Sequence, residues 1–251
     1  MSLERFKQIK RCFRVDNKMR RDKADPLSPV RNVWNLLDNK LRFFYSPEPF
    51  LTVDEQLVEY HGRVSFRMYI PSKPGAYGLE IMWLNEATTG YALKGLPYIG
   101  IKTLTNKEKG NMPITEAVTL YLMKPYLNLG YNITCDNWFT TVQLADHLCE
   151  KNTTLVGTIR QNRKDIPPAA KNKKGRQKKS AIYYISKKKV LCSFKDKKIS
   201  PILLLSTMHT SAKTLNNGIP QIVDFYNPTK GGTDNMDHML RLYRLRRKCN
   251  R

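Results

Sequence analysis

The sequence has few of the features that mark a membrane protein, a disulfide framework or a zinc site. It contains no run of eighteen apolar residues, so no segment is predicted to span a bilayer. Its five cysteines are odd in number, far apart and without a CxxC pair, which argues against both disulfides and zinc. The N-terminus is charged and lacks the apolar centre of a signal peptide. We therefore expect an intracellular protein with reduced thiols.

Acidic residues are also scarce. Lys and Arg number 44 and Asp and Glu number 21, which gives a net charge of +23. Polyanions are the natural partners of such a surface, with DNA or RNA first among them. An anionic membrane surface is the weaker alternative, because it would require a basic amphipathic helix and the basic runs here resemble loops. At 41% hydrophobic residues, the 251-residue chain can bury a core of one large domain or two small ones.

Apolar periodicity divides the chain into a short helical beginning and a longer region of strands and helices. Residues 4–15 and 28–44 carry apolar side chains at helical spacing, and the two prolines of "YSPEPF" end this pattern. Strands come next, and helices then alternate with strands, which is typical of an α/β domain on a mixed sheet. The predicted strands are 50–53, 64–70, 77–84, 89–96, one ending at Cys135, 154–159, 182–186, 190–194 and 201–207, and the later helices are 114–124, 140–150 and one starting near Asp234.

Residues 160–179, "RQNRKDIPPAAKNKKGRQKK", form the most basic segment. Its composition predicts a mobile, extended and solvated loop inserted in the domain, and we expect this loop to contact DNA. The run "KNKKGRQKK" within it is also typical of a nuclear import signal, which favours the nucleus as the location. The expected DNA-binding residues are Arg160, Arg163, Lys164, Lys171, Lys173, Lys174, Arg176, Lys178 and Lys179.

A few acids stand in unusual places. Asp136 ends a strand inside "NITCDNWFTT", and Asp234 and Asp237 lie three residues apart on one predicted helical face in "KGGTDNMDHML". Acids at a strand end or a helix start are also typical of caps, so the spacing alone leaves both interpretations open. Carboxylates converging from separate elements, within a basic surface, would suit phosphodiester cleavage with two Mg²⁺ ions.

Four blocks in sequence resemble the signatures of the piggyBac transposase family. They are "SPEPFLTVDEQLVEYHGRVSFRMYIPSKPGAYGLEI", "NITCDNWFTT", "LVGTIRQNRKDIP" and "YNPTKGGTDNMDHM", and the resemblance extends over roughly residues 1–245. It implies an RNase H-like catalytic domain whose three acids bind Mg²⁺, and insertion into DNA at TTAA. Asp136 and Asp234 match two of those acids, and Asp237 matches a further acid of the same block. Counted back from Tyr91, the first acid position falls on Glu86, where the family has Asp.

The resemblance gives a set of expectations about the site and the domains. Glu86, Asp136 and Asp234 would be catalytic, and the same three with Asp237 would hold Mg²⁺ if the acid site is still functional. The cysteine spacing, in contrast, predicts that no zinc is bound. The strand 77–84 would lie beside the strand that ends at Cys135. Residues 1–45 would be the remnant of the family's DNA-binding and dimerisation region, and residues 46–251 the RNase H-like domain, with both ends shortened relative to the family.

The same resemblance predicts the function in outline. Because Glu86 replaces an Asp and the chain is shorter than the family, we expect a DNA-binding derivative of a DDE-type transposase that has lost cleavage and strand transfer. An active Mg²⁺-dependent DDE transposase is the first alternative, and a non-functional transposon fragment is the second. The expected partners are DNA, as TTAA-type transposon ends, and a second copy of the chain in a homodimer, with no membrane.

Overall fold

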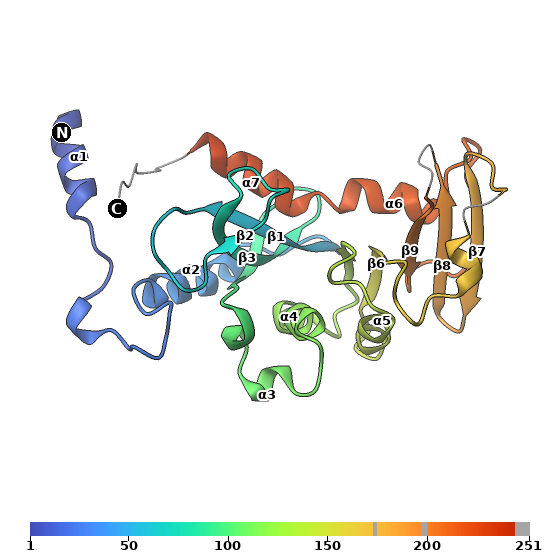
Figure 1. The fold of residues 1–251 in the computed structure, drawn as a ribbon, viewed down its shortest axis with the longest axis horizontal. Coiled ribbons are helices and arrows are strands. Elements are labelled where there is room, and N and C mark those ends of the chain that lie inside the picture. Colours follow the sequence, from blue (N-terminus) through green and yellow to red (C-terminus); the bar gives the residue numbers. More distant parts are fainter. Residues whose placement is uncertain (173–174, 197–199, 244–251) are drawn as a thin grey trace.

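The computed structural model describes residues 1–172, 175–196 and 200–243. In these ranges the chain forms one nine-stranded sheet in the order β2-β3-β1-β5-β6-β9-β8-β7, with β4 also paired to β3 (Figure 1). The predicted α/β fold, a mixed sheet flanked by helices, is confirmed. The strands are β1 (Phe50–Glu59), β2 (Met68–Tyr69), β3 (Tyr77–Glu86), β4 (Ala92–Pro97), β5 (Asn132–Cys135), β6 (Thr154–Thr158), β7 (Ser180–Ser186), β8 (Lys189–Lys195) and β9 (Ile202–Ser206).

The directions of the central strands are those of an RNase H-like sheet. β4, β3 and β1 are successively antiparallel, and β5 and β6 then run parallel to β1. β9, β8 and β7 extend the sheet beyond β6 in antiparallel pairs. The prediction that strand 77–84 lies beside the strand ending at Cys135 is wrong, because β1 lies between β3 and β5. A central β1 follows from its parallel pairing, which local sequence patterns do not report.

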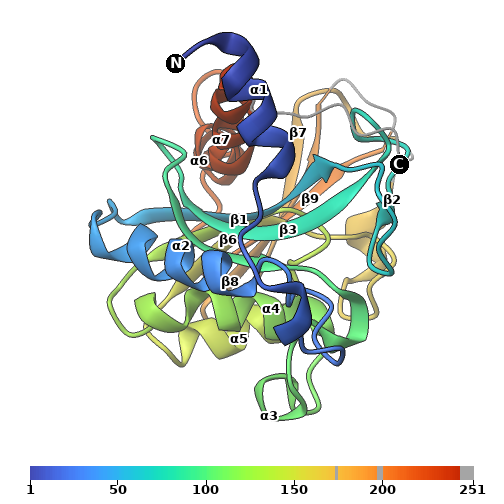
Figure 2. The ribbon, with the colours of Figure 1, turned by 90° about the vertical axis from the view of Figure 1, so that its left-hand side faces the viewer.

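Helices cover the two faces of this sheet. Figure 2 shows α4 and α5 on one face, called the α4 face below, and α6 and α7 on the other, called the α7 face. Alternate residues of a strand point to opposite faces, so β1 serves both sides. Leu51 and Val53 are buried in the core with α4 and α5, whereas the Thr52 hydroxyl donates to the Lys230 carbonyl between α6 and α7. The helices are α1 (Leu3–Cys12), α2 (Arg31–Phe43), α3 (Asn106–Lys109), α4 (Ile114–Met123), α5 (Val142–Cys149), α6 (Gln221–Thr229) and α7 (Gly232–Leu242).

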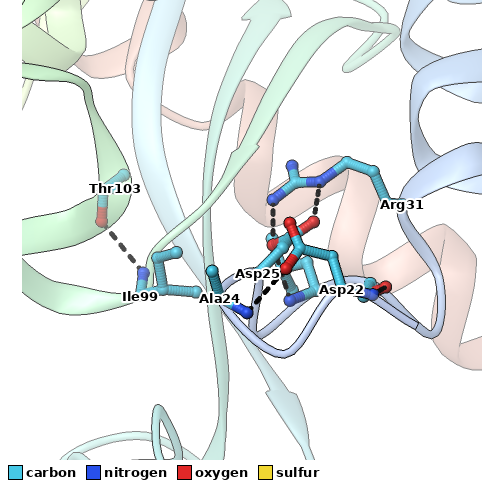
Figure 3. A network of polar contacts seen from close by, with 8 residues as sticks. Asp22, Ala24, Asp25, Arg31, Ile99 and Thr103 are labelled. Atoms are coloured by element: carbon cyan, nitrogen blue, oxygen red, sulfur yellow. Dashed lines mark hydrogen bonds and ion pairs between the residues drawn. The ribbon is translucent and has the colours of Figure 1, made fainter.

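The two predicted N-terminal helices are present and differ in their packing. α2 packs against β4, and its Trp34 ring lies 5.5 Å from the ring of Trp83. Its first turn is fixed by Arg31, whose guanidinium binds both carboxylate oxygens of Asp25 at 2.7 and 2.8 Å (Figure 3). α1 has no buried residue. No helix in the described part of the chain is long and apolar enough to cross a membrane.

Candidate active site

Two aspartates end up side by side on neighbouring strands of the α7 face. The parallel register of β1 and β5 pairs Thr52 with Thr134 and Val53 with Cys135. The next residues along are Asp54 and Asp136, and adjacent strands lie about 4.8 Å apart. Asp54 follows Thr52 by two residues and so shares its α7 face. Asp54 was not among the acids predicted from the sequence, and it is the acid that the sheet brings next to Asp136.

Helix α7 supplies a third aspartate to the same face. It runs alongside β1 in the same direction: a Cβ on Gly232 would lie 2.4 Å from Thr52 Cγ2, and further along Asp237 accepts a hydrogen bond from Gln56. Asp234 lies between these two points, just as Asp54 lies between Thr52 and Gln56. The helix therefore carries the exposed Asp234 at the level of Asp54.

Glu86 does not join this group. The antiparallel register pairs Glu86 with Leu51, which places it about 10 Å along the sheet from Asp54 and on the α4 face. Its buried carboxylate is already bound by the Tyr45 hydroxyl at 2.8 Å, the Glu48 amide at 3.0 Å and the Thr89 amide and hydroxyl. The expected convergence of Glu86 with Asp136 and Asp234 is therefore absent. Glu86 instead ties the segment before β1 to the turn between β3 and β4.

The paired aspartates sit in an environment that disfavours two negative charges. Burial, with the nearby Glu55 and Asp136 adding to its effect, raises the pKa of Asp54 to about 9. Burial also raises the pKa of Asp136, against the amide hydrogen bond it accepts from Trp138. The Asp54 carboxyl therefore keeps its proton well above the usual pH range unless a positive charge neutralises it, and the shift at Asp136 has the same direction.

One ammonium group already lies close to these acids. Lys73, on the turn between β2 and β3, binds the Glu55 carboxylate at 3.0 Å. Burial lowers the pKa of Lys73, but Glu55 together with Asp54 and Asp234 outweighs it and raises that pKa overall. Positive charge is thus stabilised next to Glu55 and within reach of the charges of Asp54 and Asp234.

The donor set has the chemistry of a magnesium site, without the geometry of a finished one. Mg²⁺ prefers carboxylate oxygens, and Asp54, Asp136 and Asp234 offer only these. Within residues 1–172, 175–196 and 200–243, no three His, Cys, Asp or Glu side chains lie close enough together to hold a metal ion. Binding Mg²⁺ would therefore require the carboxylates to draw together.

Asp237, expected as a further metal ligand, is engaged elsewhere. One of its oxygens accepts from the Gln56 amide at 2.8 Å, and the other binds Arg241 of the same helix. Both oxygens are thus occupied by donors. His238, its neighbour, is exposed.

The basic segment 160–179 is partly built into the domain, so the prediction that it is wholly solvated is wrong. Ile166 and Ala170 are buried in the core beside α5 and β8, and the Arg176 guanidinium binds the side chain and carbonyl of Ser193 at 2.7 and 2.6 Å. Composition alone did not reveal these anchors, because charged residues surround them in the sequence. Arg176 therefore has a structural role in the described protein.

Other basic residues of the segment lie nearer the acids. Arg160 donates to the Asn137 side chain at 3.1 Å, directly after Asp136, and its charge opposes the raised pKa of Asp136. Arg160, Arg163 and Lys164 line an open hollow with Gln143. The remaining expected DNA contacts in the described ranges are Lys171, Lys178 and Lys179, whereas Lys173 and Lys174 lie outside those ranges.

Comparison with known proteins assigns a chain with this sheet to the transposase class. The family model described as Transposase IS4 matches residues 1–251, so the chain belongs to this transposase family. The resemblance to piggyBac transposases is confirmed as well. A solved piggyBac transposase, in a synaptic complex with hairpin DNA, has 38% sequence identity and a TM-score of 0.92, covering 100% of this chain and 53% of its own.

Two human proteins show the same relationship in sequence. PiggyBac transposable element-derived protein 3 is 24% identical over 259 residues, covering 97% of this chain and 44% of its own length. The chimeric ERCC6-PGBD3 protein is also 24% identical over 259 residues, and the match takes in 24% of its length. The chain thus spans less than half of these curated relatives.

Proposed function

We propose that this chain forms the acid-bearing core of a DDE-type DNA transposase, with Asp54, Asp136 and Asp234 as its metal-binding acids. The observation that carries the proposal is the placement of Asp54 beside Asp136 under the helix that bears Asp234. Each aspartate comes from a different element, which is what a site for phosphodiester cleavage needs. One of the two sequence-based reasons to expect lost activity was Glu86, and Glu86 lies on the other face of the sheet.

The residues divide into distinct tasks. The three aspartates would hold Mg²⁺, which when bound supplies positive charge at the attacking and leaving oxygens of the phosphodiester. Until then, burial and the neighbouring acids keep a proton on Asp54, so binding of the cation would release it. Arg160 stands next to this site and would hold a neighbouring phosphate. The hollow lined by Arg163 and Lys164 would continue the contact along the DNA.

DNA is the partner that the charge and the relatives favour. The net charge of +23 gives a surface attractive to phosphate, and the similar solved transposase is a DNA complex. Recognition of TTAA, a second copy of the chain as partner, and import into the nucleus through residues 171–179 belong to this proposal.

A second candidate function is a DNA-binding derivative that does not cut. The observation in its favour is that the described carboxylates do not yet form a group of three at metal-binding distance. Such a protein would keep the sheet, the basic surface and the salt-dependent binding, but its aspartates would have no catalytic part.

The two functions are separated by Mg²⁺-dependent nicking of a TTAA-flanked piggyBac-type end. The DDE proposal predicts nicking by the unmodified chain and loss to background in both Asp54→Asn and Asp136→Asn, with DNA affinity retained in each. Nicking that survives Asp54→Asn would contradict the assignment of Asp54. DNA binding without nicking by the unmodified chain, in Mg²⁺ and in Mn²⁺, would instead support the non-cutting derivative.

A further inference from the structure

A relay of polar side chains connects β3, β1 and α7 next to the three aspartates. The Trp83 indole donates to the Gln56 amide oxygen at 2.9 Å, and the Gln56 amide nitrogen donates to Asp237 at 2.8 Å. Arg241 binds the other oxygen of Asp237. Gln56 is 7% exposed and Trp83 6% exposed, so water contributes little at these positions.

The chemistry of the partners fixes the orientation of Gln56. An indole N–H can only donate, so it requires the amide oxygen of Gln56 on its side. The amide NH₂ must then point away from Trp83 and toward α7. Because Asp237 can only accept when ionised, the bond between sheet and helix has a single direction. Buried networks of this kind specify one arrangement, since any other orientation leaves a polar group unpaired.

Packing alone does not hold this part of α7 in place. The buried residues of the helix are Gly232, Thr233 and Met236, all in its first half. Beyond them Leu240 and Leu242 are 51% and 69% exposed, and a groove of about 450 Å³ lies between this half of the helix and β1 and β3. The contact between Gln56 and Asp237 crosses the edge of that groove.

Two attachments therefore set the course of α7, and Asp234 lies between them. The first is the close packing of Gly232 on Thr52, supported by the hydrogen bond from Thr233 to Asn85 at 2.8 Å. The second is the relay. Without the relay, the described contacts that remain for α7 are those of its first half, at Gly232, Thr233 and Met236, and a tilt about them would move Asp234 relative to Asp54.

We infer that Gln56 is a positioning residue that holds Asp234 in register with Asp54 and Asp136. It touches neither metal nor DNA and acts through Asp237 and the helix. The inference rests on the proposed function for its consequence, because the displaced group is one of the three metal-binding aspartates. Groups that orient metal ligands without touching the metal commonly change affinity about 10- to 100-fold when removed.

The variant Gln56→Glu tests this role with little change of shape. Its carboxylate still accepts from Trp83 but no longer donates to Asp237. An added negative charge near a cation site would by itself strengthen Mn²⁺ binding, whereas a lost positioning contact weakens it. We expect calorimetric Mn²⁺ affinity to fall about 10-fold or more. The double variant Gln56→Glu, Asp237→Asn restores a donor facing an acceptor at unchanged net charge, and it should recover most of the affinity.

Hydrogen exchange of the metal-free protein gives a reading that does not depend on Mn²⁺. Amides of α7 should exchange faster in Gln56→Glu, and those of α4 and α5 should not change. Mn²⁺ affinity in Gln56→Glu equal to or above that of the unmodified chain, or a double variant no better than the single one, would overturn the inference. If the unmodified chain binds no Mn²⁺, the proposed metal site fails, and unchanged α7 exchange in Gln56→Glu would then overturn the relay separately.

Discussion

Helix α7 packs closely on the sheet at Gly232, so Gly232→Ala should introduce a steric clash there. A Cβ at this position would lie 2.4 Å from Thr52 Cγ2 and 2.8 Å from the Glu86 carbonyl oxygen. The second neighbour is backbone and cannot rotate away, so the helix must shift by roughly 1 Å to reach normal contact. Overpacking of this kind typically costs about 1–3 kcal/mol, which exceeds the helix-propensity gain of about 1 kcal/mol from replacing glycine by alanine.

The adjacent glycine provides a matched control. A Cβ on Gly231 would meet nothing within 4 Å, and its backbone, at φ −90° and ψ 8°, is accessible to alanine. Gly231→Ala should therefore leave the free energy of unfolding unchanged or raise it by less than about 1 kcal/mol. Both variants replace glycine by alanine at neighbouring positions. The effects of the change on helix propensity and on the entropy of the unfolded chain therefore largely cancel when the two variants are compared.

Denaturant unfolding and DNA nicking together measure the result. We expect Gly232→Ala to be less stable than Gly231→Ala by about 1–3 kcal/mol. A shift of about 1 Å at Asp234 should also lower nicking on the order of 100-fold at temperatures where the variant remains folded. Equal stability and equal activity of the two variants would refute the seating of α7 against Thr52 and the carbonyl of Glu86.

Three further predictions follow from individual contacts. Burial raises the pKa of Glu80 from 4.5 to about 7, with the Glu55 charge adding to this effect and the Lys73 charge opposing it. Folding therefore favours the protonated form of Glu80, and the stability of the unmodified chain falls as pH rises from about 4.5 to 7. Glu80→Gln should remove this loss, gaining at most about 3 kcal/mol over wild type at pH 8 and nothing at pH 4, as urea denaturation would show; a gain independent of pH would contradict it. Arg176→Ala should lower the melting temperature, because the hydroxyl and carbonyl of the buried Ser193 lose the donors that Arg176 supplies. It should hardly alter the salt slope, which is the slope of log K for DNA binding against log salt concentration, and a smaller slope would instead place Arg176 on DNA. Lys164→Ala should leave the melting temperature unchanged and reduce that salt slope by about one, and an unchanged slope would remove Lys164 from the interface.

Much of the fold could be predicted from the sequence because its periodicity is strong. The alternation of β1, with Leu51 and Val53 buried, and the apolar spacing of α2 and α7 are local properties that a short window reveals. The order of the strands is not local. It depends on the parallel pairing of β1 with β5, between residues more than eighty positions apart in the chain.

The candidate site shows the same limit more clearly. Asp136 and Asp234 stand next to a strand end and a helix start, where an acid attracts notice. Asp54 lies within a strand, where an acid is usually taken for the solvent side of the alternation. The available signal was the run "LTVDEQ", in which the acid follows buried apolar residues. Counting from Tyr91 located Glu86 along the chain, but it could not tell which face of the sheet Glu86 would take.

The central claim is that Asp54, and not Glu86, completes the acid site, and Mn²⁺ titration of two conservative variants tests it most directly. Asp54→Asn and Glu86→Gln each replace one carboxyl group by the amide of the same shape, and circular dichroism would verify that both remain folded. The account predicts that Asp54→Asn weakens Mn²⁺ binding at least as much as Asp136→Asn does. It also predicts that Glu86→Gln binds Mn²⁺ as the unmodified chain does, while unfolding more readily because its hydrogen bonds to Tyr45 and Glu48 are altered. Mn²⁺ binding lost in folded Glu86→Gln and retained in Asp54→Asn would contradict the account.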